Sequence, residues 1–198
     1  MVGLKPDEAW VVLVEAVDAP PGEAWLGEGE RRRMAGMPPG RARQYQWGRR
    51  LLRLLLARAT GYGPECFAFP AEGPPVPQGP PGLLIPQVTL THSGDFIAAA
   101  AGREPLGLDV ERRGTRRDWA GLGRHLGLPE PWDEPTILRA WTRREARFKA
   151  GETGPWSLWR FGDRRFEACL ALKAGVSPRW VGEDGGPIPG PDFRPGEP

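Results

Sequence analysis

Three carboxylates and a lysine stand at spacings that could serve one phosphate-handling site. Asp109 and Glu111 lie two positions apart in an apolar stretch that predicts a strand, so both side chains are expected on one face. Glu145 and Lys149 lie four positions apart in a stretch that predicts a helix, so they are expected on one helical face. Grouped carboxylates repel one another unless a cation compensates, and with water and phosphate oxygens they suit a hard ion such as Mg²⁺. Lys149 would then be left to pair with a phosphate.

Each pair alone also has an ordinary structural explanation. Two acidic residues on a strand most often mark a solvated edge, and a glutamate and a lysine one turn apart usually form a surface salt bridge. The pairs are separated by 36 positions, from Asp109 to Glu145, and each lies in an apolar context. Their combination favours a shared site, while both readings stay open at this point.

Four segments in chain order resemble the 4′-phosphopantetheinyl transferases of the Sfp type, in their longer, single-chain class. The family patterns are Arg-x-Leu-Leu, Ser/Thr-His-Ser, Gly-Ile/Val-Asp-Ile/Val-Glu and Trp-x-x-Lys-Glu-Ala/Ser-x-x-Lys. The matching segments are Arg49–Arg53, Leu90–Asp95, Leu106–Glu111 and Trp141–Lys149. The resemblance covers residues 28–172. It implies an enzyme that transfers the 4′-phosphopantetheine group of coenzyme A to a serine of an apo acyl or peptidyl carrier protein and releases 3′,5′-ADP.

The resemblance also implies how coenzyme A is held. It places Arg49, Thr91 and His92 at the 3′-phosphate, and Lys149 at the pyrophosphate. From the residues alone, the favoured interpretation of His92 is a neutral histidine in a turn, hydrogen-bonded to backbone.

The metal and the catalytic groups follow from the same resemblance. Mg²⁺, with Mn²⁺ as an alternative, is expected at Asp109, Glu111 and Glu145. Lys149 is expected to stabilise charge on the pyrophosphate. The base for the serine hydroxyl is left open among Glu145, Glu111 and Glu130. Glu130 belongs to the loosest match, in which the segment Arg124–Glu130 resembles the family's Arg-Phe-Phe/Leu-x-x-x-Glu stretch.

Two basic segments have both an ordinary and a functional reading, and two positions depart from the family pattern. Arg31–Arg33 is expected on a helix, either as a solvated face or as cations near a polyanion. The loop Arg112–Asp118 is expected to be solvated, and the resemblance implies that it faces an acidic carrier. Pro74 stands where a basic residue often contacts the nucleotide, which bears on affinity. Arg144 stands where lysine usually precedes the glutamate.

The hydrophobic pattern predicts the elements that must position these residues. Strands are expected near residues 10–17, 96–101, 106–111, 156–161 and 165–172, with a last one near 180–181, and helices near 28–37, 41–60, 119–126 and 134–150. The proline-rich segment 64–86 predicts a loop along the rim of the site. The resemblance implies an α+β fold of two similar α/β subdomains related by a pseudo-twofold, with the active site in the cleft between them. We expect residues 1–102 to form the N-terminal subdomain on the coenzyme A 3′-phosphate side, residues 103–182 the C-terminal subdomain with the metal site, and residues 183–198 a disordered tail.

Bulk properties exclude little but are consistent with this expectation. The chain has 198 residues and a formal net charge of +2, which is too small to imply nucleic acid as a partner. Its two cysteines, Cys66 and Cys169, have no metal or redox spacing and are expected to be free, buried thiols. No apolar run approaches the length of a membrane span and no secretory pattern opens the chain, so we expect a cytoplasmic protein without a membrane partner. The resemblance favours a monomer.

Two other function classes fit the same residues. One is another Mg²⁺-dependent phosphoryl or phosphodiester enzyme, which would hydrolyse nucleotides or nucleic acid without a carrier. The other is a non-catalytic module that binds a polyanion through its arginines and would keep binding after loss of Asp109.

Overall fold

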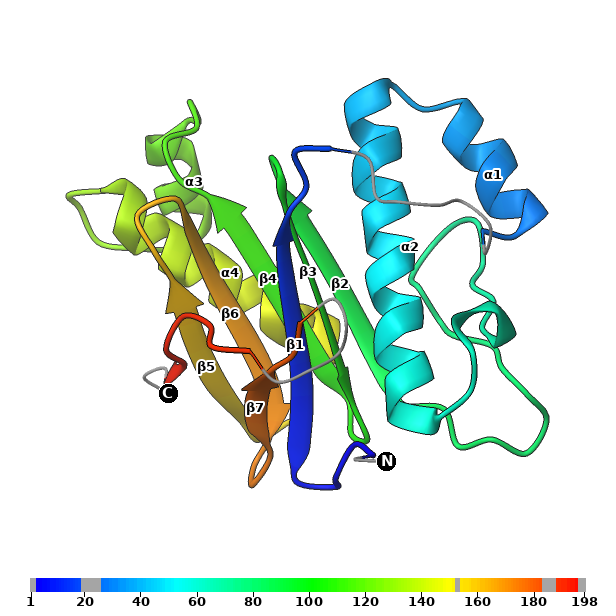
Figure 1. The fold of residues 1–198 in the computed structure, drawn as a ribbon. Helices are drawn as coiled ribbons and strands as arrows, with labels where there is room; N and C mark the ends of the chain where they lie inside the picture. Colours follow the sequence, from blue (N-terminus) through cyan, green and yellow to red (C-terminus); the bar gives the residue numbers. More distant parts are fainter. Residues whose placement is uncertain (1–2, 19–25, 152–153, 183–187, 196–198) are drawn as a thin grey trace.

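The computed structural model describes residues 3–18, 26–151, 154–182 and 188–195 of the chain. Within these residues the fold is α+β, as expected, with two four-stranded sheets and a long helix on the outer side of each (Figure 1). The facing sides of the two sheets share one apolar cluster that includes Val11, Ala98, Leu108 and Leu170.

The first sheet has the strand order β2-β3-β1-β7. Its strands are β1 (Glu8–Glu15), β2 (Gln87–Ser93), β3 (Phe96–Gly102) and β7 (Ser177–Trp180). β3 pairs antiparallel with both β1 and β2, whereas β7 pairs parallel with β1.

The second sheet has the order β4-β6-β5-β8. Its strands are β4 (Leu106–Arg112), β5 (Trp156–Gly162), β6 (Phe166–Lys173) and β8 (Arg194–Pro195), all paired antiparallel. The helices are α1 (Glu28–Ala35), α2 (Pro39–Thr60), α3 (Trp119–His125) and α4 (Glu134–Ala150), with a 3₁₀ turn at Pro64–Cys66.

Helix α2 covers the outer face of the first sheet because its apolar stripe meets one side of β1. Alternation along β1 directs Trp10 and Val12 toward α2 and Val11 toward the second sheet. Leu52 and Leu56 of α2 are fully buried in the same cluster as Trp10. The apolar face of α2 is therefore fixed against the sheet, and polar side chains of α2 lie beside the edge strand β2.

Helix α4 covers the outer face of the second sheet and lies unusually close to β4. The Asp133 side chain caps its first turn by accepting a hydrogen bond from Thr136 N at 2.8 Å. A Cβ atom placed on Gly107 of β4 would lie 1.9 Å from the Ala146 carbonyl oxygen, so only glycine allows this approach. The glycine two positions before Asp109 thus brings α4 against the strand that carries the acidic pair.

Most expected elements are present, and four features differ from expectation. The segment Thr91–Ser93 lies in strand β2 rather than in a turn. β7, inside the range expected for the second subdomain, pairs with β1 of the first sheet. Of the two free cysteines, Cys169 is buried as expected and Cys66 is exposed.

The fourth difference concerns the expected tail. Residues 183–187 and 196–198 lie outside the described residues. Residues 188–195 pack back on the fold: β8 pairs with β5, and the Phe193 ring stacks on Trp180 with centroids 4.7 Å apart. The expectation of a disordered tail is therefore wrong for this part of it. No helix in the described parts of the chain is long and apolar enough to cross a membrane.

Candidate active site

Three of the four sequence motifs meet where the edge strands β2 and β4 lie side by side. Thr91 Oγ1 donates a hydrogen bond to Asp109 Oδ1 at 3.0 Å and accepts one from Val110 N at 3.3 Å. Lys149 Nζ reaches the same Asp109 Oδ1 at 2.8 Å and the Leu108 carbonyl oxygen at 3.1 Å. Asp109 is therefore held by a hydroxyl from one sheet and an ammonium from α4.

Asp109 is the most constrained of the acidic groups at this site. The residue is 6% exposed, and its Oδ2 atom is buried without a hydrogen-bond partner among the described residues. Burial raises the pKa of this carboxyl to about 6, against the opposing effect of Lys149 and with a small further increase from Glu111. A buried, unsatisfied carboxylate oxygen next to a second carboxylate is a strong acceptor for a further cation or donor.

Glu111 projects from the same face of β4 and is bound by two donors. Ser93 Oγ donates to Glu111 Oε2 at 2.7 Å, and Arg117 Nη2 lies 2.5 Å from the same oxygen. Ser93 Oγ also accepts from Arg112 N at 3.0 Å, which ties the end of β2 to the end of β4. In this structure a protein cation neutralises each carboxylate of the pair.

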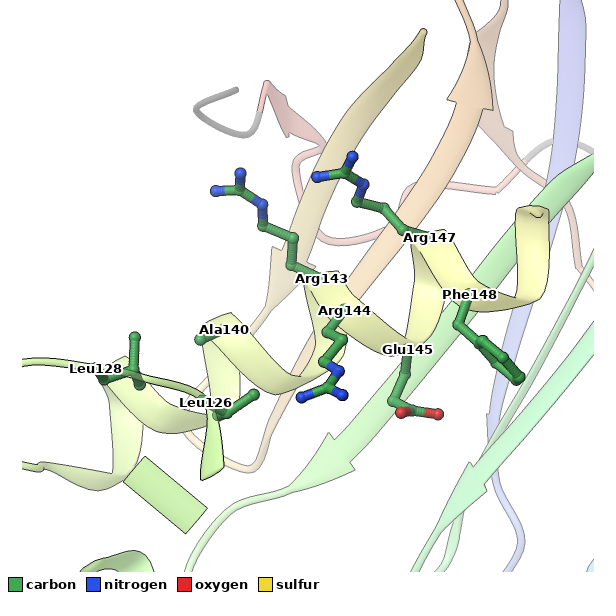
Figure 2. Close-up of a pocket in the computed structure, with 8 residues that line it drawn as sticks. All are labelled: Leu126, Leu128, Ala140, Arg143, Arg144, Glu145, Arg147 and Phe148. Atoms are coloured by element: carbon green, nitrogen blue, oxygen red, sulfur yellow. The ribbon is translucent and has the colours of Figure 1, made fainter. Parts of the chain in front are cut away.

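Glu145 lies outside this cluster. It is half-buried and lines a hollow of about 610 Å³ between α4 and the segment that follows α3 (Figure 2). Within the described residues neither Glu145 nor the exposed Glu130 forms a hydrogen bond or an ion pair. The structure thus brings together Asp109, Glu111 and Lys149, and it does not bring Glu130 to them.

The expected metal ligands are only partly assembled. Among the residues that the structure describes, no three side chains of His, Cys, Asp or Glu form a group that could hold a metal ion. Asp109 and Glu111 do fit a hard divalent cation in donor type, because both offer carboxylate oxygens and Asp109 Oδ2 has no partner. Such a cation would compete with Lys149 and Arg117 for these oxygens.

A second, smaller hollow of about 140 Å³ lies on the β2 side, between α1, α2 and the proline-rich segment. It is lined by Arg33, Arg41, Gln44, Tyr45, Arg49, Ala71, Gly73, Pro75, Leu90 and His92. Three arginines and a histidine make it a suitable site for an anion. The proline-rich segment contributes to its wall, as expected for a rim loop.

Arg49 is the best-positioned donor in this hollow. It is 4% exposed, its Nη2 donates to the Pro70 carbonyl oxygen at 2.8 Å, and its Nε lies 3.2 Å from Glu30 Oε1. Its Nη1 is buried without a hydrogen-bond partner among the described residues. The guanidinium is thus oriented by protein contacts and retains an unused donor.

His92 faces the same hollow and touches Arg41, whose Nη1 contacts the imidazole nitrogens. Burial, together with the nearby cations Arg41 and Lys149, lowers the pKa of His92 to about 4. His92 is therefore neutral near pH 7, and an anion placed beside it would favour its protonated form.

Several contacting residues were not identified from the sequence. Arg41 and Tyr45 line the small hollow, and Ser93 donates a hydrogen bond to Glu111. Arg117 forms an ion pair with Glu111. Ser93 belongs to the Thr-His-Ser segment and could have been included on that ground. Arg41 had no distinguishing signal, because it is one of many arginines on α2.

Comparison with known proteins adds no assignment. Neither a scan against models of known protein families nor a search of curated proteins finds a match for this chain.

Proposed function

We propose that this protein is a 4′-phosphopantetheinyl transferase of the Sfp type that uses coenzyme A and a divalent cation to modify a carrier protein. The observation that carries the proposal is the contact of Thr91 and Lys149 with one oxygen of Asp109. These residues come from three segments widely separated in the sequence, each of which resembles a different motif of that family. Independent surface features would have no reason to meet at one atom.

The small hollow supports a place for the coenzyme A 3′-phosphate. Arg49 offers its unused Nη1, and Arg41 and His92 line the same space. Thr91, next to His92 in β2, connects this hollow to Asp109 and Lys149. A ligand with phosphates at both ends, such as coenzyme A, could therefore contact the hollow and Lys149 at once.

The charge of the pyrophosphate requires cations. Lys149 would move part of its interaction from Asp109 to a phosphate oxygen. Asp109 and Glu111 would then hold Mg²⁺, or Mn²⁺, with Glu145 as the expected third ligand. When bound, the ion would neutralise charge on the phosphates.

The transfer itself needs a nucleophile, a proton acceptor and a leaving group. The carrier serine Oγ forms a bond to the β-phosphorus of coenzyme A, and the bond from that phosphorus to the bridging oxygen breaks, so that 3′,5′-ADP leaves. The serine proton goes to a carboxylate. Glu145 suits this role only where Asp109 and Glu111 alone hold the ion, because a metal-bound carboxylate is a poor base; Glu111 Oε2 already accepts from Ser93 and Arg117. Glu130 is exposed and has no contact with the cluster.

We also infer that the two halves of the fold are related by a pseudo-twofold, with the site in the cleft between them. The first half runs β1-α1-α2-β2-β3 and has the strand order β2-β3-β1. The second runs β4-α3-α4-β5-β6 and has the order β5-β6-β4. The same connectivity with the same pairing supports two equivalent units, and we expect them to act as one monomer in the cytoplasm.

The test is the intact mass of an apo acyl carrier protein incubated with this protein, coenzyme A and Mg²⁺. A gain of one phosphopantetheine that is lost without metal and with Asp109→Asn would support the proposal. Glu130→Gln serves as the matched carboxylate control and should retain activity. Absence of both modification and coenzyme A binding would reject it, and hydrolysis of phosphodiesters without a carrier would favour the other enzyme class.

A further inference from the structure

A third hollow, of about 330 Å³, lies between helix α4 and strand β5, and we call it the α4–β5 hollow. Its volume falls at the lower end of the range for small-molecule sites, about 300–1,000 Å³. Arg143, which lines it, extends from α4 away from Glu145 (Figure 2), since residues two positions apart point to nearly opposite sides of a helix. None of the residues that line this hollow belongs to the acidic cluster around Asp109 or to the small hollow beside Arg49.

Three arginines line the α4–β5 hollow: Arg139 and Arg143 from α4, and Arg160 from β5. Arg139 Nη2 donates to Thr136 Oγ1 at 3.0 Å. Arg160 donates to Glu167 Oε1 from Nη2 at 3.0 Å and from Nε at 3.2 Å. Arg143 forms no hydrogen bond or ion pair within the described parts of the chain. Two guanidinium groups are thus oriented by the fold, and the third is available to a ligand.

The positive charge around this hollow exceeds the negative charge that the fold places beside it. Among the described groups that act on these arginines, two are carboxylates. Glu167 is 4% exposed, and both Arg160 and Arg113 pair with it. Asp133 caps the start of α4, and Arg139 acts on it electrostatically. Together with the unpaired arginine, four guanidinium groups therefore stand against two carboxylates, and this excess suits a dianion.

Apolar side chains form the rest of the α4–β5 hollow. Leu128 comes from the segment after α3, Ala140 from α4 and Leu158 from β5. Cys169 of β6 is buried beside them, and burial raises its pKa to about 12, so it stays a neutral thiol and adds no negative charge. A bare inorganic anion would use only the guanidinium groups, whereas an anion with a small apolar substituent would also cover the leucines.

We propose that the α4–β5 hollow binds a small organic phosphate. The phosphate would lie among the three arginines, whose forked N–H groups bind phosphate oxygens in pairs. A phosphate monoester is largely dianionic at pH 7, because its second pKa is about 6, and it therefore matches the excess charge better than a monocarboxylate. The apolar part of the ligand would contact Leu128 and Leu158. The inference goes beyond the proposed function and does not depend on it.

The experiment is a titration of the full chain with phenyl phosphate, followed by amide-detected NMR. Inorganic phosphate and benzoate are titrated in parallel. The expected result is a saturable set of shifts centred on Ala140, Arg143 and Leu158. Phenyl phosphate should bind about tenfold more tightly than benzoate, because it carries a second charge. It should also bind more tightly than inorganic phosphate, because its ring covers apolar surface.

Variants of Arg143 test which group holds the phosphate. Arg143→Gln should raise the Kd for phenyl phosphate about tenfold, since hydrogen bonds to a charged group are lost. Arg143→Lys should give a smaller rise, because it keeps the charge and loses the fork. Arg41→Gln removes an arginine from the small hollow beside Arg49, and it should leave the Kd at the α4–β5 hollow unchanged. Arg143 has no partner in the described residues, so these variants should keep the wild-type spectrum elsewhere.

Three outcomes would overturn the inference. Shifts confined to the neighbourhood of Arg41 and His92 would assign the phosphate to the small hollow instead. Equal affinities for benzoate and phenyl phosphate would reject a phosphate ligand. Shifts that grow linearly without saturation, or a Kd that Arg143→Gln leaves unchanged, would reject a defined site. None of these results bears on the proposed transfer, which the titration does not measure, so the two can fail separately.

Discussion

The two outer helices carry the same kind of residue in opposite environments. On α2, Arg49 and Arg53 are 4% and 1% exposed and both contact Glu30 of α1, which is itself 3% exposed. On α4, Arg143 and Arg147 have no such partner among the described residues. The comparison indicates that Arg49 and Arg53 of α2 are fixed by a buried carboxylate, whereas Arg143 and Arg147 of α4 are not held by any such contact among the described residues.

The difference follows from what each helix has beside it. α1 supplies a carboxylate to α2, and Arg53 Nη2 lies 2.6 Å from Glu30 Oε2 while its Nε donates to the Phe67 carbonyl oxygen at 3.1 Å. α4 has the short helix α3 beside it, which places the ring of His125 next to Arg144 but supplies no carboxylate to Arg143 or Arg147 among the described residues. Burial of charge is tolerated only with such compensation, so α2 could bury its arginines and α4 could not.

Removing the shared carboxylate should have the largest effect. Glu30→Ala leaves two buried guanidinium groups without their partner and should lower the free energy of unfolding by about 3–5 kcal/mol. Urea unfolding followed by circular dichroism measures this. Glu28→Ala, on the same helix but with an exposed side chain that lies 3.8 Å from Arg32, is the control and should change stability by less than about 0.5 kcal/mol. Equal losses in the two variants would contradict the comparison.

The next effect concerns the cation at the acidic pair. Lys149→Met removes the ammonium that contacts Asp109 and that would meet the pyrophosphate, and transfer activity should fall about 10²–10³-fold. Single-turnover transfer to the carrier is the measurement. Lys173→Met removes a lysine that pairs with Glu104 at the surface and should leave the rate unchanged. Comparable rates for Lys149→Met and wild type would argue against the site.

His92 gives a prediction about pH. Its folded-state pKa of about 4 lies below the ordinary value of 6.5, because of burial and of the cations Arg41 and Lys149. As the pH falls, the unfolded chain therefore binds this proton first. Stability from this group is complete above pH 6.5 and is lost between pH 6.5 and about 4, by an amount on the order of 1 kcal/mol after allowance for partial exposure.

Urea unfolding at pH 7 and pH 5 checks this, with His92→Gln compared with the wild type. The variant should lose less stability than the wild type between the two pH values. Bound 3′,5′-ADP should also raise the pKa of His92 in a histidine NMR titration, because its phosphate offsets the neighbouring cations. A pKa of His92 that does not change would show that the 3′-phosphate does not bind beside it.

The sequence predicted the elements better than the contacts between them. The apolar pattern located α2 and α4 to within a few residues because each buries one face. It located β3 and β4 because their continuous apolar runs are buried on both faces. The i, i+2 spacing predicted that Asp109 and Glu111 share one face of β4. The contact of Lys149 with Asp109 could be expected only from the combination of motifs and the resemblance, and Glu145, which the i, i+4 spacing pairs with Lys149, lies outside the cluster.

What the sequence could not give depended on packing between distant segments. β7 pairs with β1, and the Phe193 ring stacks on Trp180. Neither contact could be predicted from a local sequence pattern, because each depends on how separate segments pack. The partners of the arginines were equally hidden. Arg49 and Arg143 are both arginines on a predicted amphipathic helix, and helical periodicity does not distinguish their environments. Only the structure shows that Glu30 pairs with Arg49.

A smaller effect is expected at Arg117, the cation on Glu111. Arg117→Gln frees one carboxylate oxygen from its ion pair and should tighten Mn²⁺ binding about threefold, because the metal no longer competes with the guanidinium. Electron paramagnetic resonance of free Mn²⁺ measures the affinity without any enzymatic assay. Arg116→Gln is the matched loop control and should leave the affinity unchanged. Weaker Mn²⁺ binding in Arg117→Gln would show that Arg117 supports the acidic pair rather than competing at it.

The smallest stability effect is expected on α4 itself, and it is the other half of the comparison with α2. Arg147→Ala removes an exposed side chain without a described partner, and alanine favours helix, so the free energy of unfolding should change by less than about 0.5 kcal/mol. Arg53→Ala, which leaves Glu30 buried beside one guanidinium instead of two, should lose several times more. Urea unfolding of both variants decides the point. If Arg147→Ala were as destabilising as Arg53→Ala, Arg147 would form contacts within the fold that contribute to stability, and the contrast between α4 and α2 would be wrong.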